Sequence, residues 1–147
     1  MDEPVLIDLI NGGNLPGLVD SMSFHQARLG LIARNVANMH TPGYRAGQLD
    51  VAGFQGALRK AFTQRGSNST VPWRLEGGSE LQTDEAGRLQ VKPSFNPVEN
   101  LLFHDGTNVS IEHEMSELAQ AGMMHDLAAQ LLRAQFEGLR KAIRGRQ

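Results

Sequence analysis

The segment "NVANMHTPGYRA", residues 35–46, decides the fold because it ends a helical pattern on a sharply defined turn. Pro42 cannot continue a helix, and it disfavours the helical region for the residue before it. Proline and glycine also suit the two central positions of a type II turn, since Pro42 fixes φ and Gly43 accepts a positive φ. A helix is therefore predicted to end near Asn38 or Met39, and the chain to reverse immediately afterwards.

The residues upstream of this turn carry an unbroken seam of apolar side chains at steps of three and four. Such spacing predicts an amphipathic helix that packs along a second helix. Asn14 is the expected N-cap and Pro16 suits the first turn, so the helix is predicted over residues 14–39. The seam consists of Leu15, Leu18, Met22, His25, Leu29, Ile32, Val36 and Met39, of which the histidine is the one polar member.

A second, longer seam of the same spacing runs through the last quarter of the chain. It predicts a helix over residues 108–145, with Asn108 or Ser110 as the N-cap. Glutamates in its early turns suit the positive end of the helix dipole. The seam consists of Ile111, Met115, Leu118, Gly122, His125, Ala129, Leu132, Phe136, Leu139 and Ile143.

This second helix is expected to be too long and too broadly apolar for a compact globule. About 34 residues at a rise of 1.5 Å each span roughly 50 Å, whereas a chain of this size folds to a diameter of only about 40 Å. A helix that is apolar on more than one side needs more than one neighbour. We therefore expect an elongated molecule in which partners cover the additional apolar residues: Met124, Leu127, Ala128 and Leu131.

The two seams predict a mainly α fold in which the terminal helices pair as one coiled-coil domain. Residues 1–13 are expected to be a flexible N-terminus. Residues 40–107 are expected to form the turn, a short helix and an irregular, partly ordered middle segment, because this stretch is polar and rich in turn residues. Phe54, Leu58 and Phe62 have helical spacing within it, and "GRLQVK", residues 87–92, predicts one strand.

Composition excludes several classes of protein. A net charge of −2 gives no overall field for binding nucleic acid or a membrane, and the absence of cysteine excludes disulfides and thiolate metal sites. "MDEPVLIDLINGG", residues 1–13, lacks the basic start and long apolar core of a signal peptide. No apolar run is long enough to span a bilayer. Basic residues near the C-terminus suit the end of a helix dipole: Arg133, Arg140, Lys141, Arg144 and Arg146.

Both ends of the chain resemble the flagellar basal-body rod and hook proteins. The N-terminal signature of that family is commonly Asn-aliphatic-Ala-Asn-x-x-Thr-Pro-Gly-Tyr followed by a basic residue. "NVSIEHEMSELAQAGMMHDLAAQLLRAQFEGLRKAI", residues 108–143, looks like the closing helix of the same family. The short length and the helix after the turn are most similar to the proximal-rod members. The matching positions are Asn35, Ala37, Asn38, Thr41, Pro42, Gly43, Tyr44, Arg45, Asn108, Val109, Glu112, Glu114 and Met115.

The resemblance implies an antiparallel pairing of the terminal helices in a structural subunit of the rod, without catalytic residues, cofactor or metal. Such a subunit polymerises into the hollow drive shaft that transmits torque from the membrane ring. The implied partners are further copies, other rod proteins, the MS-ring and export-gate core, and the type III export machinery. The implied location is the periplasmic rod of the basal body, reached without a cleaved signal peptide.

Three groups of site residues follow. The signature turn comprises Asn35, Asn38, Thr41, Pro42, Gly43 and Tyr44. "FQGAL", residues 54–58, resembles an element that flagellar subunits present to the export gate, through Phe54 and Leu58. The expected helix-helix and subunit interface comprises Leu18, Met22, Leu29, Ile32, Val36, Met115, Leu118, Leu132, Phe136, Leu139 and Ile143.

The chain departs from the family pattern at a few positions. Ala121, His125 and Asp126 stand where the family usually has asparagine, tyrosine and glutamine in its closing helix, and His40 replaces a commoner small polar or acidic residue. These differences bear on a polar contact midway along that helix. They leave the apolar spacing unchanged.

Two other functions remain open at this level. "HEMSE", residues 113–117, approximates a zinc-peptidase pattern and would make the chain a metal-dependent hydrolase using His113, Glu114 and Glu117, although the position of the second histidine is a glutamate. The chain could also be a soluble coiled-coil adaptor or chaperone-like binder. His25 and His125 could face each other across an antiparallel pair, as a hydrogen-bonded, pH-sensitive or metal-binding contact.

Overall fold

The structure is a computed structural model that describes residues 13–41, 44–66, 71–95 and 108–145, with the backbone alone described for residues 108–110. The flexible terminus expected over residues 1–13 therefore lies outside the described part, apart from its last residue. The elements in chain order are α2 (Leu15–Asn38), α3 (Val51–Arg65), β1 (Leu81–Thr83), β2 (Leu89–Val91) and α4 (Asn108–Arg144).

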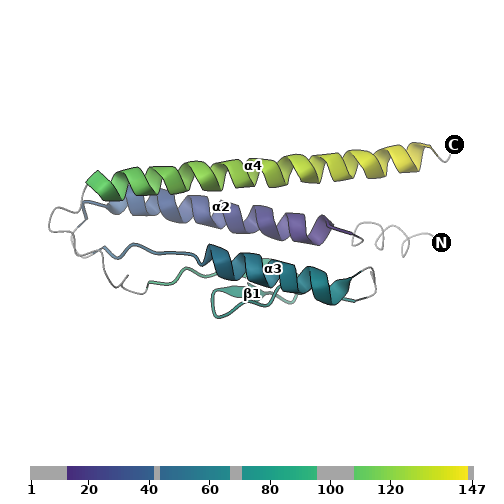
Figure 1. Cartoon of the computed structure of the whole chain (residues 1–147), viewed down its shortest axis with the longest axis horizontal. Helices are drawn as coiled ribbons and strands as arrows, with labels where there is room; N and C mark the ends of the chain where they lie inside the picture. The colour runs from purple at the N-terminus through teal and green to yellow at the C-terminus, as the bar shows by residue number, and fades with distance from the viewer. Residues whose placement is uncertain (1–12, 42–43, 67–70, 96–107, 146–147) are drawn as a thin grey trace.

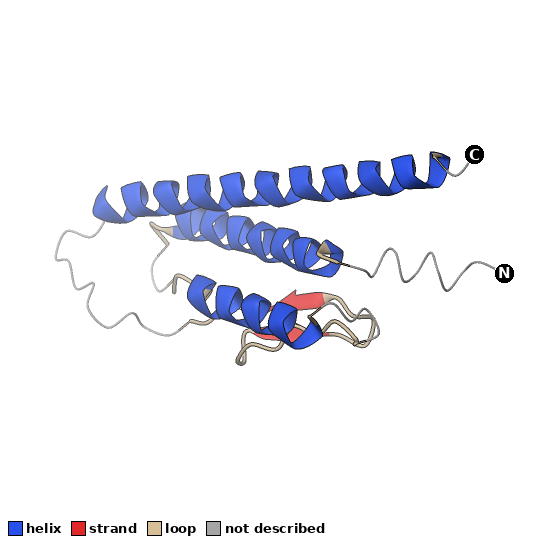
Figure 2. Cartoon of the chain, turned by 45° about the vertical axis from the view of Figure 1, so that its right-hand side comes forward, coloured by secondary structure: helices blue, strands red, loops and turns tan. Residues whose placement is uncertain are grey.

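The mainly α fold with paired terminal helices is confirmed. Figure 1 shows α2 and α4 lying side by side and running in opposite directions along an elongated molecule. The contacts between them have the register of an antiparallel pair, because His25 lies near His125 whereas Arg28, later in α2, bonds to Glu117, which comes earlier in α4. The 37 residues of α4 correspond to about 55 Å, so this helix extends well past the start of α2 (Figures 1 and 2).

The ends of α2 lie within one residue of the predicted limits, but its start is built differently from the prediction. Asn14 occupies the N-cap position and a proline lies in the first turn, yet the Asn14 side chain makes no capping hydrogen bond. Its φ of −90° and ψ of −2° are close to helical values, whereas a capping side chain needs an extended backbone. The α2 N-terminus is therefore held by the proline geometry rather than by a side-chain cap.

The buried core lies on the face of α2 that points away from α4. Figures 1 and 2 place α2 between α4 on one side and α3 with the β-hairpin on the other. Phe24 is fully buried and stacks on Phe54 of α3, with ring centroids 4.0 Å apart and planes within 4°. The middle segment is thus anchored to α2 by an apolar core: Phe24, Phe54, Ala57, Ala61, Leu75 and Leu81.

The middle segment contains a two-stranded antiparallel hairpin in which Leu81 pairs with Val91 and Thr83 with Leu89. The strand predicted from "GRLQVK" is β2, and its partner β1 was not predicted. Asp84 closes the turn between the strands by accepting a hydrogen bond from the Arg88 amide at 2.8 Å. The chain enters α3 through a regular N-cap, since the Asp50 carboxylate accepts from the Gly53 amide at 2.8 Å. None of the described helices combines the length and apolar character needed to cross a membrane.

Candidate assembly interface

Asn35 organises the chain where it leaves α2. This buried side chain donates to the Gly47 carbonyl at 2.9 Å and accepts from the Gly47 amide at 3.1 Å. It also accepts from the Tyr44 hydroxyl at 3.2 Å. The amide of Asn35 therefore pairs with a backbone residue as a neighbouring strand would, and it satisfies both polar groups of Gly47.

The turn between these contacts closes as expected for a β-turn. The Tyr44 amide donates to the Thr41 carbonyl at 3.2 Å. The Asn38 side-chain amide donates to the Arg34 carbonyl, one turn earlier in α2, at 2.9 Å. Pro42 and Gly43 lie outside the described residues, so the predicted type II geometry stays a prediction.

Gly47 is glycine for a packing reason. A β-carbon at this position would lie 2.8 Å from Leu31 and 3.1 Å from Phe95. The first distance is shorter than real β-carbon contacts and the second is tighter than most of them, so Leu31 and Phe95 would have to shift. The return of the chain over α2 therefore favours a residue without a side chain at this position, twelve residues beyond Asn35.

The signature residues of the two chain ends meet at Asn35 and Glu114. Burial raises the pKa of the Glu114 carboxyl, and the nearby Asn35 side-chain amide, which can act as a hydrogen-bond donor, partly offsets that rise. Sequence reasoning placed both residues in family motifs but did not pair them. The pairing connects the end of α2 to the first turns of α4.

An ion pair that was not predicted lies beside this contact. Arg28 of α2 is buried and donates a hydrogen bond to the Glu117 carboxylate at 2.7 Å. It also donates to the Gln120 side-chain oxygen at 3.5 Å. A buried charge needs such a partner. The sequence signal was the arginine itself, which lies between the seam residues His25 and Leu29 of α2.

Replacing Asn35 with alanine is expected to destabilise the protein by about 1–3 kcal/mol, because the buried amide and carbonyl of Gly47 would lose their partner. Urea unfolding followed by circular dichroism measures this loss. Asn38→Ala is the matched control, because Asn38 only bonds back within its own helix at an exposed position. An equal loss in both variants would contradict the role assigned to Asn35.

His25 of α2 and His125 of α4 lie close enough for their charges to interact across the helix pair. Burial lowers the pKa of His25, and the charges of Arg28 and His125 lower it further. The Nδ1 atom of His25 is buried and has no hydrogen-bond partner within the described part of the chain. A protonated His25 is therefore disfavoured in the folded protein.

The helix pair is expected to lose stability as the pH falls below about 6.5, the ordinary histidine pKa. The unfolded chain binds a proton there before folded His25 does, so acid favours unfolding; above that pH the contribution is fully present. The raised pKa values of Asp20 and Glu114 act in the opposite direction. Urea unfolding at pH 7.5 and 5.0 should thus show a smaller acid-induced loss in His25→Gln than in the parent, and an identical loss would contradict the assignment.

The predicted seam residues divide into a covered and an uncovered group. Ile32 is buried between the helices, and most others are half-buried, namely Leu18, Met22, Leu29, Val36, Leu118, Leu132 and Leu139. Met115, Phe136 and Ile143 are exposed. Among the α4 residues whose side chains are described, Ala121 and Ala128 are buried, whereas the seam had placed Gly122 and Ala129 there. Small side chains at these positions allow α2 and α4 to approach closely.

A second apolar stripe on α4 has no partner in the described part of the chain. The outer stripe consists of Met124, Leu127 and Leu131, which are 42%, 50% and 49% exposed. The spacing of three and four puts these residues on one side of the helix, away from α2. Ala128, predicted to widen the stripe, is buried against α2 instead.

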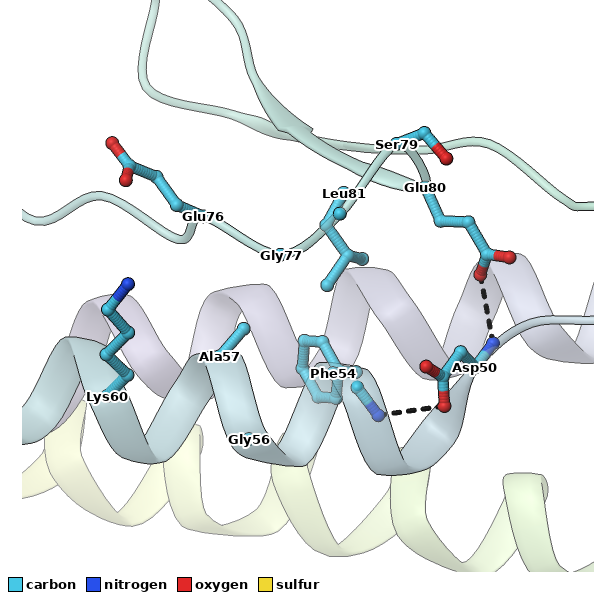
Figure 3. Close-up of a pocket in the computed structure, with 12 residues that line it drawn as sticks. Asp50, Phe54, Gly56, Ala57, Lys60, Glu76, Gly77, Ser79, Glu80 and Leu81 are labelled. Carbon is cyan, nitrogen blue, oxygen red and sulfur yellow. Dashed lines mark hydrogen bonds between the residues drawn. The ribbon is translucent and has the colours of Figure 1, made fainter.

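Other parts of the described surface include a groove beside α3 and the residues of the hydrolase pattern. A groove of about 410 Å³ runs between α3 and residues 76–81, with Lys60 and Glu76 toward one end and the capping Asp50 at the other (Figure 3). Glu80 accepts a hydrogen bond from the Asp50 amide there, at 3.0 Å. In the hydrolase pattern, Glu117 is engaged by Arg28. No group of three potential metal ligands occurs within the described ranges.

The described residues thus form a long antiparallel helix pair and leave an apolar stripe of α4 uncovered. The known proteins similar to this chain are flagellar basal body rod proteins. Flagellar basal body rod protein FlgB of Aeromonas hydrophila is 27% identical over 127 residues, which cover 86% of this chain and 89% of the relative. FlgB of Salmonella typhimurium is 24% identical over 133 residues, and FlgB of Escherichia coli 25% over 126 residues.

These similarities confirm the predicted resemblance to flagellar basal-body rod proteins, and among them to FlgB. They extend across the middle of the chain as well as its two ends, since the Salmonella protein covers 86% of this sequence. No known protein-family model matches the chain. No solved structure matches it significantly.

Proposed function

We propose that this protein is a structural subunit of the flagellar basal-body rod and not an enzyme. The observation that carries the proposal is the outer stripe of α4. Its three large apolar side chains are about half exposed, and they lie on the longest of the described helices. The similarity of the chain to FlgB supports the flagellar rod as the assembly in which that surface is buried.

The subunits assemble by burying the outer stripe against neighbouring copies or other rod proteins. Contact between two different surfaces on successive subunits does not close on itself and so propagates into a filament. Gly138 lies C-terminal to the stripe, and a β-carbon there would meet nothing within 4 Å, so the surface is open to a close neighbour. Torque from the membrane ring passes through these interfaces along the hollow shaft.

Export precedes assembly in this proposal. Phe54 is only 2% exposed and Leu58 is half-buried against the core, so the folded subunit does not display the candidate export-gate element. The chain presents this element to the type III machinery while it is unfolded. It then folds in the periplasm and joins the rod next to the MS-ring and export-gate core.

Deletion of the gene tests the proposal. A strain that lacks this chain is expected to form the inner-membrane ring but no rod beyond it, and to be non-motile. Electron microscopy of purified basal bodies and swimming in soft agar measure these outcomes, with the gene restored on a plasmid as the control. Intact, rotating flagella in the deletion strain would overturn the proposal.

A further inference from the structure

The C-terminal end of α4 carries a piece of seam that α2 does not reach. Figures 1 and 2 show α4 continuing past the start of α2. Steps of three and four keep Phe136, Leu139 and Ile143 on the side that faces α2 further back, at Leu132 and His125. Phe136 is 45% exposed and Ile143 is 60% exposed. We call residues 136–144 the overhang.

The charge of the overhang is positive along one flank. Arg133, Arg140 and Arg144 follow each other at helical spacing beside the apolar side chains, and only Glu137 has the opposite sign nearby. An occupant of this surface therefore needs apolar side chains and several acidic residues. It also has to lie next to the start of α2, where the overhang begins.

The sequence immediately before α2 has this composition. "MDEPVLIDLI", residues 1–10, contains five large aliphatic residues, three acidic residues and no basic side chain. Gly13 has a φ of +68°, which lets the chain change direction just before α2. Ten residues span at least about 15 Å, which exceeds the roughly 13 Å of the overhang at 1.5 Å per residue.

We propose that residues 2–10 dock on the overhang of the same chain and extend the antiparallel contact beyond α2. The aliphatic side chains cover Phe136, Leu139 and Ile143. The acidic residues Asp2, Glu3 and Asp8 lie toward the arginine flank. Docking leaves the outer stripe on the other side of α4 free, so this contact belongs to the single subunit and does not depend on assembly into a rod.

Engineered disulfides test this docking directly, because the chain contains no cysteine. The test variant combines Ile7→Cys with Ile143→Cys. The matched control combines Ile7→Cys with Ala142→Cys, an exposed position at almost the same height but turned by about 100° around the helix. Both variants are oxidised at low protein concentration, and intramolecular bonds are quantified by mass spectrometry and non-reducing electrophoresis.

The Ile143 pair is expected to form its intramolecular bond at least about fivefold faster than the Ala142 pair, because docking raises the local thiol concentration. Neutralising Asp2, Glu3 and Asp8 to their amides should reduce that advantage. Trp73 fluorescence verifies that each variant is folded. Equal rates for the two pairs would overturn the proposal. Bonds formed only between two chains would overturn it as well, and would assign the overhang to a second copy.

Discussion

Replacing both Leu127 and Leu131 with glutamate should abolish rod assembly and swimming while leaving the isolated subunit as stable as the parent. Each side chain is half exposed, so the monomer loses little when it becomes charged, since exposed substitutions usually stay within about 0.5 kcal/mol. In the assembled rod the same charges would be buried without partners, which costs several kcal/mol per ion. Soft-agar swimming, basal-body yield and thermal unfolding of the purified protein measure the three quantities.

Ala119→Glu combined with Gln130→Glu provides the matched control for this variant. Both positions are exposed on α4 and lie on its charged flank, away from the outer stripe. The control adds the same two charges but should swim normally. If the control is also immobile, added charge rather than the stripe causes the defect. If the Leu127 and Leu131 variant swims normally, the outer stripe is not a subunit interface.

Replacing Phe24 with alanine should remove about 3–5 kcal/mol of folding free energy, because it empties a fully buried aromatic site. Domains of this size are stable by only about 5–15 kcal/mol. The ring of Phe24 stacks on Phe54, so the loss should first release α3 and the hairpin from α2. Urea unfolding followed by Trp73 fluorescence measures it, since Trp73 donates a 2.7 Å hydrogen bond to Asp20 of α2.

Phe95→Ala serves as the control, because Phe95 is 54% exposed and should cost less than about 1 kcal/mol. An equally small loss at Phe24 would contradict the core described here. Phe54→Ala should be as destabilising as Phe24→Ala, since the two rings form one stack. Export is then the distinguishing measurement: secretion impaired only in Phe54→Ala supports the export-gate proposal, and equal secretion of both variants contradicts it.

Local patterns in the sequence were sufficient to predict the positions of the long helices α2 and α4. The Thr41-Pro42-Gly43 turn placed the end of α2 correctly because proline acts on the residues next to it. The spacing of three and four placed α4 and its contact with α2, because helical periodicity appears directly in the order of residues. Excess apolar width predicted that α4 has more surface than α2 covers, as the exposure of Leu127 shows.

Periodicity was less informative where one helix contacts two neighbours. The α2 seam was assigned to a single face, so Phe24 was left out although it is the most buried residue of the helix. Strand β1 has three residues, too few to show an alternating pattern. Arg28 and Asn35 were visible as polar residues in an apolar helix, but their partners lie 89 and 12 positions away.

By itself, the sequence determined where the long helices begin and end, which sides of them are apolar, and that the chain resembles rod proteins. Those properties depend on residues within a few positions of one another. Only the tertiary structure decided that α2 lies between α4 and the middle segment, that Asn35 holds Gly47, and that the apolar surplus of α4 divides into an outer stripe and an overhang. The physical reason is that burial and hydrogen bonding depend on which distant segments meet, and local spacing does not encode that choice.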